Sequence, residues 1–292
     1  MSCLLQNVLW LYNLRYKHLT WLYKIIYHLV SNISQQGASM KMKKILSVCA
    51  LSVFMCVNAM AEQINVLAAA SLKYVLEDIK SEFLKTHKKD KIEVSYISSG
   101  KAYAQIQNGS PTHLFIAADV SYPQKLYDEK LAPSQPSNYA KGKLVLFSAN
   151  ADFKADNIEI LKNDKIKHIA IPNPKLAPYG RAAEEFLQSQ KLEKKLKSKL
   201  SVGDSIGQAT SYVLQGASEV GFSALSMVIK DKTPHLTYTL IDENTYKPIN
   251  QALIIPNHGK DSKLTQEFVE YILTSKVAEK IFQEYGYDKA DK

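Results

Sequence analysis

The segment INVLAAASLKYVLEDI, Ile64–Ile79, changes its hydrophobic period partway along its length. Its first half alternates apolar residues with others, as a strand does, and from Leu72 onward apolar residues recur at helical spacing. Ser71 stands at the junction, directly after three alanines. A strand that passes into a helix in this way, repeated along a chain, predicts an α/β architecture with parallel sheets.

The same step recurs through the rest of the chain. We expect strands at Ile64–Ala68, Lys91–Ser98, Thr112–Asp119, Gly142–Ala149, His168–Pro174, Val220–Leu225 and Asn250–Pro256. We expect helices at Leu72–Thr86, from Gly100, at Tyr122–Leu131, Gly180–Gln190, Ser262–Thr274 and Val277–Tyr285. No Pro/Gly/Ser-rich linker separates consecutive domains, so a second lobe at 144–240 is expected to be inserted into a first lobe made of 62–143 and 241–292. Lys143–Ala149 and Gln251–Ile255 are the expected crossing segments.

The N-terminal part reads as two pieces. Met40–Ala61 has a lysine-rich start, a short apolar run and the ending Ala-Met-Ala, which is typical of a secretory signal peptide cleaved before Glu62. Residues 1–39 do not fit this plan and form a doubtful extension, with a start at Met40 or Met42 expected; a basic membrane-associated helix is the alternative. The three cysteines all precede Glu62, so a processed chain would have no disulfide, thiol nucleophile or thiolate metal ligand.

The formal net charge of +9 raises the question of a nucleic-acid partner. The lysines are scattered, however, and runs such as Leu192–Leu200 mix lysine with glutamate as a solvated helix face does. Much of the positive excess also lies before Glu62. No nucleic-acid partner is therefore expected.

Several expected strand-to-helix junctions carry small or hydroxyl residues, among them Ser71, the Ser98–Ser99 pair, Tyr179 and Ile206. Helix N-termini offer unpaired N–H groups to an anion, and ligands of open α/β sheets lie beyond the carboxyl ends of the strands. Each serine taken alone is better explained as a helix N-cap that binds nothing, and only the serines together favour a ligand. The pattern by itself predicts a small anion or polar ligand in a cleft.

Signals for catalysis are weak. The sequence has no G-x-S-x-G elbow, H-E-x-x-H or phosphate-binding Walker loop, and the histidines after Glu62 lack metal-ligand spacing. A serine hydrolase using Ser71 or Ser99 would need a histidine that the fold brings near. No catalytic residue, cofactor or direct metal ligand is assigned, and the chain is not expected to be an enzyme.

The motifs together resemble one known family. The stretches NVLAAASLKYVLEDI, SYISSGKAYAQIQNGSPTHLFIAAD, NPKLAPYGRAAEEFL, LQGASEVGFSAL and AEKIFQEYGY are similar to the molybdate-binding proteins of bacterial molybdate ABC transporters, over Ile64–Tyr287. The resemblance implies a two-lobed, type II periplasmic solute-binding fold that closes over one tetrahedral oxyanion. It further implies a periplasmic protein, expected to be a monomer, that delivers molybdate, with tungstate also expected, to a membrane permease.

The resemblance also implies ligand contacts. Ser71 and Ser99 match the family's ligand serines, and Tyr179 and Ile206 stand where backbone N–H groups are supplied. Ala224 stands where some members have a tyrosine hydroxyl, and Tyr179 is bulkier than the usual small residue. A molybdate dianion requires donors, which hydroxyls and N–H groups supply. The alternatives are a binder of sulfate, a binder of ferric iron held by tyrosines such as Tyr179 and Tyr212, and a secreted serine hydrolase.

Overall fold

The computed structural model describes residues 61–290. The expected N-terminal extension and all but the last residue of the expected signal peptide lie outside the described residues. Among the residues described, no helix has both the length and the apolar character needed to cross a membrane.

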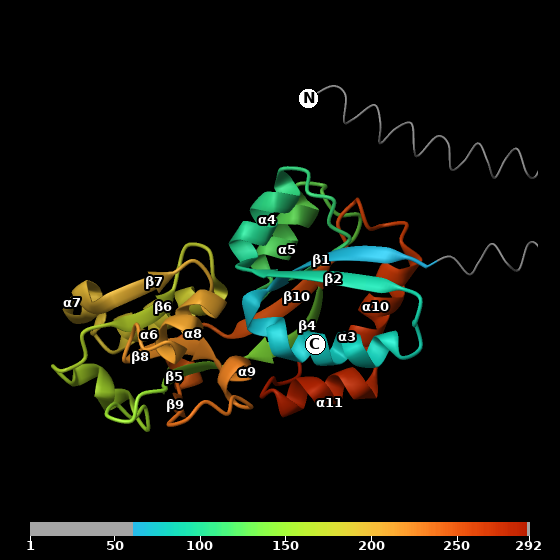
Figure 1. Ribbon diagram of the computed structural model, residues 1–292. Helices are drawn as coiled ribbons and strands as arrows, with labels where there is room; N and C mark the ends of the chain where they lie inside the picture. Colours follow the sequence, from blue (N-terminus) through green and yellow to red (C-terminus); the bar gives the residue numbers. More distant parts are fainter. Residues whose placement is uncertain (1–60, 291–292) are drawn as a thin grey trace, which may run out of the picture. The chain divides into compact units, whose positions relative to one another are not determined.

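Two five-stranded sheets form the centres of two lobes (Figure 1). The sheet of the first lobe has the order β2 (Lys91–Ile97), β1 (Gln63–Ala69), β3 (Leu114–Ile116), β10 (Ile249–Ile254) and β4 (Ser137–Gly142). The sheet of the second lobe has the order β7 (Leu200–Gly203), β6 (Ile169–Pro172), β8 (Val220–Ala224), β5 (Leu144–Ser148) and β9 (Thr237–Leu240). The two-lobed α/β fold is thus confirmed, whereas the residue-level lobe boundaries stay a prediction.

The expectation of parallel sheets holds only in part, because each sheet contains two parallel and two antiparallel strand pairs. β10 runs antiparallel to β3 and β4, and β5 runs antiparallel to β8 and β9. Parallel neighbours require a crossover that returns to the same sheet. The chain instead passes from β4 straight into β5 of the other sheet through Lys143, and it re-enters the first sheet at Ile249. The segment Gln251–Ile255 was expected to cross between the lobes. Its residues up to Ile254 instead lie within β10 of the first sheet.

The helices cover both faces of the sheets. The first lobe has α3 (Lys73–Leu84), α4 (Ser99–Gln107), α5 (Ser121–Asp128), α10 (Lys263–Thr274) and α11 (Lys276–Glu284). The second has α6 (Pro178–Ser189), α7 (Glu193–Leu196), α8 (Ile206–Leu214) and α9 (Leu225–Val228). Single 3₁₀ turns lie at η2 (Ala70–Leu72), η3 (Ile158–Lys162), η4 (Lys197–Lys199) and η5 (Glu243–Thr245). Figure 1 shows α9 where the lobes meet.

The period-two alternation of β1 divides the core of the first lobe. Val66 and Ala68 pack in the cluster that includes Phe268 of α10, whereas Leu67 packs with Ala102 and Ile106 of α4. Because successive side chains of a strand point to opposite faces, β1 is buried on both sides between two helical layers. A fully buried central strand fixes its register, and with it the position of Ser71 at its end.

Gly180 lets the first turn of α6 lie directly on the end of β6. A Cβ atom at this position would overlap the Pro172 carbonyl oxygen and approach the Asn173 backbone. Backbone atoms cannot yield as a flexible side chain can.

Gly180→Ala is therefore expected to lower the free energy of unfolding by about 1–3 kcal/mol, measured by denaturant titration. Glu184→Ala, at a partly exposed position of the same helix, is the control. Equal stability of the two variants would contradict the close packing of α6 on β6.

Candidate functional site

Three adjacent strands of the first lobe end at one edge of the sheet. β1 lies between β2 and β3, with Ala69 beside Ile97 and Ala68 beside Ile116. Ser71, the Ser98–Ser99 pair and Ala118 follow these three strands, each within two residues of a strand end. The Ser99 hydroxyl accepts a hydrogen bond of 3.0 Å from the Ala118 N–H. The structure therefore brings the two predicted serines to neighbouring strand ends.

The second lobe presents helix N-termini at the ends of its strands. β6 leads to α6, whose first residue is Pro178 and whose N-cap, Ala177, has no capping side chain. β7 leads to α8, where the Ser205 hydroxyl caps the helix by accepting from the Gln208 N–H at 3.2 Å. Tyr179 and Ile206 lie within these first turns, where N–H groups have no partner inside the helix.

Some serine hydroxyls at the strand ends cap a helix, whereas others have no hydrogen-bond partner. The N-cap interpretation holds for Ser205, as it does for Ser262 before α10. Ser98 is the N-cap residue of α4, yet its side chain makes no capping bond. Ser71 and Ser98 are 1% and 3% exposed, and within residues 61–290 neither hydroxyl has a hydrogen-bond partner. A buried hydroxyl without a partner is costly, which marks both as candidates for a ligand contact.

The strand ends of the two lobes touch one another around these hydroxyls. The Gly100 N–H donates to the Leu176 carbonyl oxygen before α6 at 2.9 Å. A Cβ placed on Gly207 of α8 would lie 3.4 Å from the Ala70 Cβ. The Ser226 hydroxyl of α9 donates to the Ser71 carbonyl oxygen at 2.9 Å. The described chain therefore has its lobes in contact, and the small side chains before Ser71 allow this close approach.

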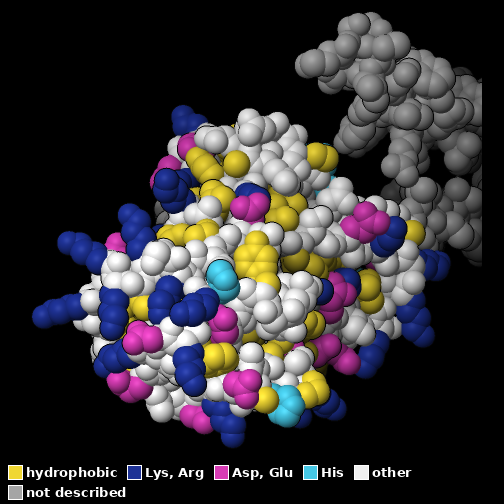
Figure 2. Space-filling model, turned by 60° about the vertical axis from the view of Figure 1, so that its left-hand side comes forward, with side chains coloured by type: hydrophobic (Ala, Val, Ile, Leu, Met, Phe, Trp, Pro, Cys, Tyr) yellow, Lys and Arg dark blue, Asp and Glu magenta, His cyan; other side chains and the backbone are white. Residues whose placement is uncertain are grey.

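Charged side chains link the lobes at the margin of this region. Arg181 of α6 forms an ion pair with Asp119, which also accepts from the Ser121 hydroxyl at 2.8 Å. Lys101 of α4 pairs with Asp204 at 2.6 Å. The one carboxylate that closely follows the Ala118 strand end is thus neutralised by an arginine. On the face shown in Figure 2, basic side chains are spread among acidic ones.

The predicted contacts Tyr179 and Ala224 lie in the core below the strand ends. The Tyr179 hydroxyl accepts from Gln251 Nε2 at 3.1 Å, so the ring reaches toward β10 of the other lobe. Ala224 is the last residue of β8 and fully buried. Its neighbour Ser223 is bonded to the Thr210 hydroxyl at 2.7 Å. Tyr179 and Ser223 thus direct their hydroxyls to Gln251 and Thr210, so neither stands in for the tyrosine hydroxyl that some members of the family have at the position of Ala224.

Sequence reasoning missed three polar residues here: Ser98, Gln251 and Tyr287. The family resemblance assigns the ligand contact to Ser99, although Ser98 stands beside it in the same serine pair. Tyr287 and Gln251 come from the C-terminal part, far from Ser71 in the sequence. A polar residue within a largely apolar strand is the one sequence signal that could have identified Gln251, which is fully buried in β10.

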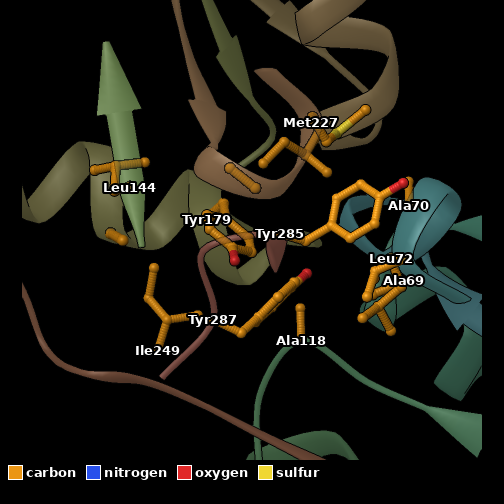
Figure 3. Packing of buried hydrophobic residues seen from close by; sticks show 14 of the residues in the cluster. Ala69, Ala70, Leu72, Ala118, Leu144, Tyr179, Met227, Ile249, Tyr285 and Tyr287 are labelled. Atoms are coloured by element: carbon orange, nitrogen blue, oxygen red, sulfur yellow. The ribbon is translucent and has the colours of Figure 1, made fainter. Parts of the chain in front are cut away.

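Buried tyrosines surround the base of the region. Figure 3 shows Tyr179 and Tyr287 between Leu144 and Ile249 on one side and Ala69, Ala70 and Leu72, which flank Ser71, on the other. Burial raises the pKa of Tyr287 to about 12, and it raises the pKa values of Tyr139 and Tyr179 well above the usual value of 10.0. All three are therefore neutral hydroxyl groups at physiological pH.

A tyrosine whose pKa is higher in the folded than in the unfolded state stabilises the folded protein. This contribution is complete below the unfolded-state pKa, near 10, and is lost as pH rises toward the folded-state pKa. We expect the free energy of unfolding to fall between pH 10 and pH 12. Phenolate absorbance should show these tyrosines ionising only when the chain unfolds. Tyr179→Phe should reduce the pH dependence, whereas Tyr74→Phe, at a position 41% exposed, should leave it unchanged. Equal pH dependence in both variants would contradict the assignment.

Other candidate chemistries find little support in the described residues. In that part of the chain no hydrogen bond joins a histidine ring to Ser71 or Ser99; His113, for example, accepts from the Asn65 N–H near the opposite end of β1. No group of three or more His, Cys, Asp or Glu side chains between residues 61 and 290 is arranged to hold a metal ion.

Comparison with known proteins agrees with this architecture. The family of bacterial extracellular solute-binding proteins matches residues 64–288. The molybdate-binding protein ModA of Azotobacter vinelandii is 40% identical over 232 residues, covering 78% of this chain and 91% of that protein. ModA of Rhodobacter capsulatus is 37% identical over 190 residues, covering 65% of this chain and 74% of that protein.

A solved structure gives the same result for the fold. The periplasmic molybdate-binding protein of Azotobacter vinelandii superposes with a TM-score of 0.73 at 33% identity, covering 78% of this chain and all of that one. The agreement extends over both lobes and the strand ends between them. The chain belongs to the bacterial extracellular solute-binding proteins, in the branch that contains the molybdate-binding proteins.

Proposed function

We propose that this protein captures molybdate, and tungstate as well, at the strand ends between its lobes. The observation that carries the proposal is the buried hydroxyl of Ser71, which has no partner among the described residues and lies beside the first turn of α8. Ser71 and Ser99 are the proposed hydroxyl donors, and Tyr179 and Ile206 the proposed backbone donors. Ala224 contributes only the wall of the cavity.

The donor set fits a fully deprotonated tetrahedral dianion. Hydroxyls and helix N-terminal N–H groups donate hydrogen bonds, and the helix dipoles favour negative charge. Ser99 accepts from Ala118, so its own proton remains available to a ligand. A partly protonated phosphate would instead benefit from an acceptor, and Asp119 is already engaged by Arg181. Discrimination against the smaller sulfate would depend on cavity size, since a smaller ion leaves donors unpaired.

The wider role follows from the family. We propose a periplasmic binding protein, not an enzyme, that works without a cofactor as a monomer and passes its ligand to the permease of an ABC transporter. Hinge motion of the lobes would open and close the site. The relatives that carry the name molybdate-binding protein support this role, since the match extends over nearly the whole of both lobes.

The iron-binding alternative is weaker on physical grounds. Iron is held by phenolate oxygens, whereas burial raises the pKa of Tyr179 well above its usual value. Ionising such a group would cost the energy that burial imposes on a charge. The hydrolase alternative lacks a histidine base at either serine within the described residues.

Titration calorimetry of the purified protein with molybdate, tungstate, sulfate and phosphate tests the proposed ligand. We expect tight one-to-one binding of molybdate and tungstate, and weak or no binding of sulfate and phosphate. Strong sulfate binding without molybdate binding would overturn the assignment, and so would binding of ferric iron alone.

Ser71→Ala and Ser99→Ala should each weaken molybdate binding by about 1–3 kcal/mol, because each removes a donor to the anion. Ser218→Ala is a matched control: Ser218 is 2% exposed, its hydroxyl also has no partner among the described residues, and it precedes β8 at the other end of that strand. Wild-type affinity in both site variants would remove these serines from the site.

A further inference from the structure

The carbonyl oxygen of Ser71 is held by two hydroxyls from different parts of the chain. The Ser226 hydroxyl lies 2.9 Å from it and the Tyr287 hydroxyl 3.3 Å from it. The Tyr287 hydroxyl also lies 3.1 Å from the Ser226 hydroxyl, so the three groups form a closed triangle. All three residues are buried.

The triangle joins the two lobes. Ser226 belongs to α9, which follows β8 of the second lobe, whereas Ser71 ends the central strand of the first lobe. Tyr287 follows α11, and its neighbour Asp288 pairs with Lys141 of β4 through backbone bonds of 2.9 and 3.0 Å. Tyr287 therefore stays with the first lobe, and a movement of the second lobe away from the first removes Ser226 from the triangle.

Packing holds the Tyr287 hydroxyl in place. The Tyr287 ring meets the Phe282 ring edge-on, with centroids 5.5 Å apart. Gly286 has a φ of +79°, and a side chain there would also meet Leu225 of α9. A rigid ring and a sharp backbone turn thus direct one hydroxyl to the Ser71 peptide.

We infer that Ser226 and Tyr287 form a clasp on the Ser71 peptide that couples lobe closure to the positioning of the Ser71 hydroxyl. The carbonyl oxygen is an acceptor that would repel an anion, and the clasp occupies it with two donors. The Ser71 hydroxyl, one side chain away, stays without a partner in the described residues and is directed to the ligand. Ser226 and Tyr287 are positioning residues, since they act on the ligand through Ser71. This inference rests on the proposed oxyanion site.

The test is calorimetric titration of the purified protein with molybdate, using Ser226→Ala, Tyr287→Phe and the double variant. Each single variant should bind molybdate about three- to tenfold more weakly. Tyr285→Phe is the matched control, because its hydroxyl, two residues away, donates to Asp78 rather than to Ser71. It should bind as the wild type does.

Two further readouts separate positioning from a general loss of structure. Ser226→Ala should change the melting temperature of the ligand-free protein no more than Tyr285→Phe does, because each variant removes only one hydroxyl group. The losses in the double variant should not simply multiply, because both hydroxyls act on one oxygen.

The outcomes distinguish the clasp from the site itself. Absence of molybdate binding by the wild type would overturn the proposed function. Molybdate binding by the wild type together with unchanged affinity in Ser226→Ala and Tyr287→Phe would overturn the clasp alone. Affinity losses that follow the melting temperature of the ligand-free variants, or that multiply in the double variant, would also contradict it.

Discussion

A buried hydroxyl that lacks a partner is the constraint around which this molecule is arranged. Leaving a hydroxyl in that state costs about 1–3 kcal/mol, and a hydrogen bond to a ligand would offset that cost. Ser71 stands in that state at the end of a strand whose register is fixed on both faces. The surrounding groups are donors or small side chains, from the first turns of α6 and α8 to the alanines before Ser71.

Donors alone do not make an anion site, because nearby acceptors must also be kept from the ligand. The Ser71 carbonyl oxygen is occupied by the Ser226 hydroxyl, and the Asp119 carboxylate is occupied by Arg181. The phenols below remain uncharged because burial raises their pKa values. The basic side chains described at the margin of this region, Arg181 and Lys101, are each paired with an aspartate, so hydroxyl and N–H donors are the groups offered to an anion.

The sequence was sufficient for most of the helices and strands, but not for the contacts between distant segments. Hydrophobic period and junction residues located α3, α6 and α10 close to their observed bounds. The edge strand β4 was missed because its polar residues carry no strand period. The strand at β10 was expected, but its antiparallel direction was not, because pairing direction depends on where the chain re-enters the sheet. Tyr287 and Gln251 make their contacts only through tertiary packing, and no local pattern predicts partners that lie 216 and 72 residues away in the sequence.

The contacts between the lobes bear on how quickly a bound ion could leave. Hydrogen bonds and ion pairs that join the lobes, such as Lys101–Asp204 and Ser226–Ser71, must break before the lobes separate, so they lengthen the residence time of an enclosed ion. A carrier that must scavenge a scarce ion gains from a slow release, yet a carrier that must unload gains from a fast one. The number of such cross-lobe contacts therefore sets a compromise between tight capture and fast release.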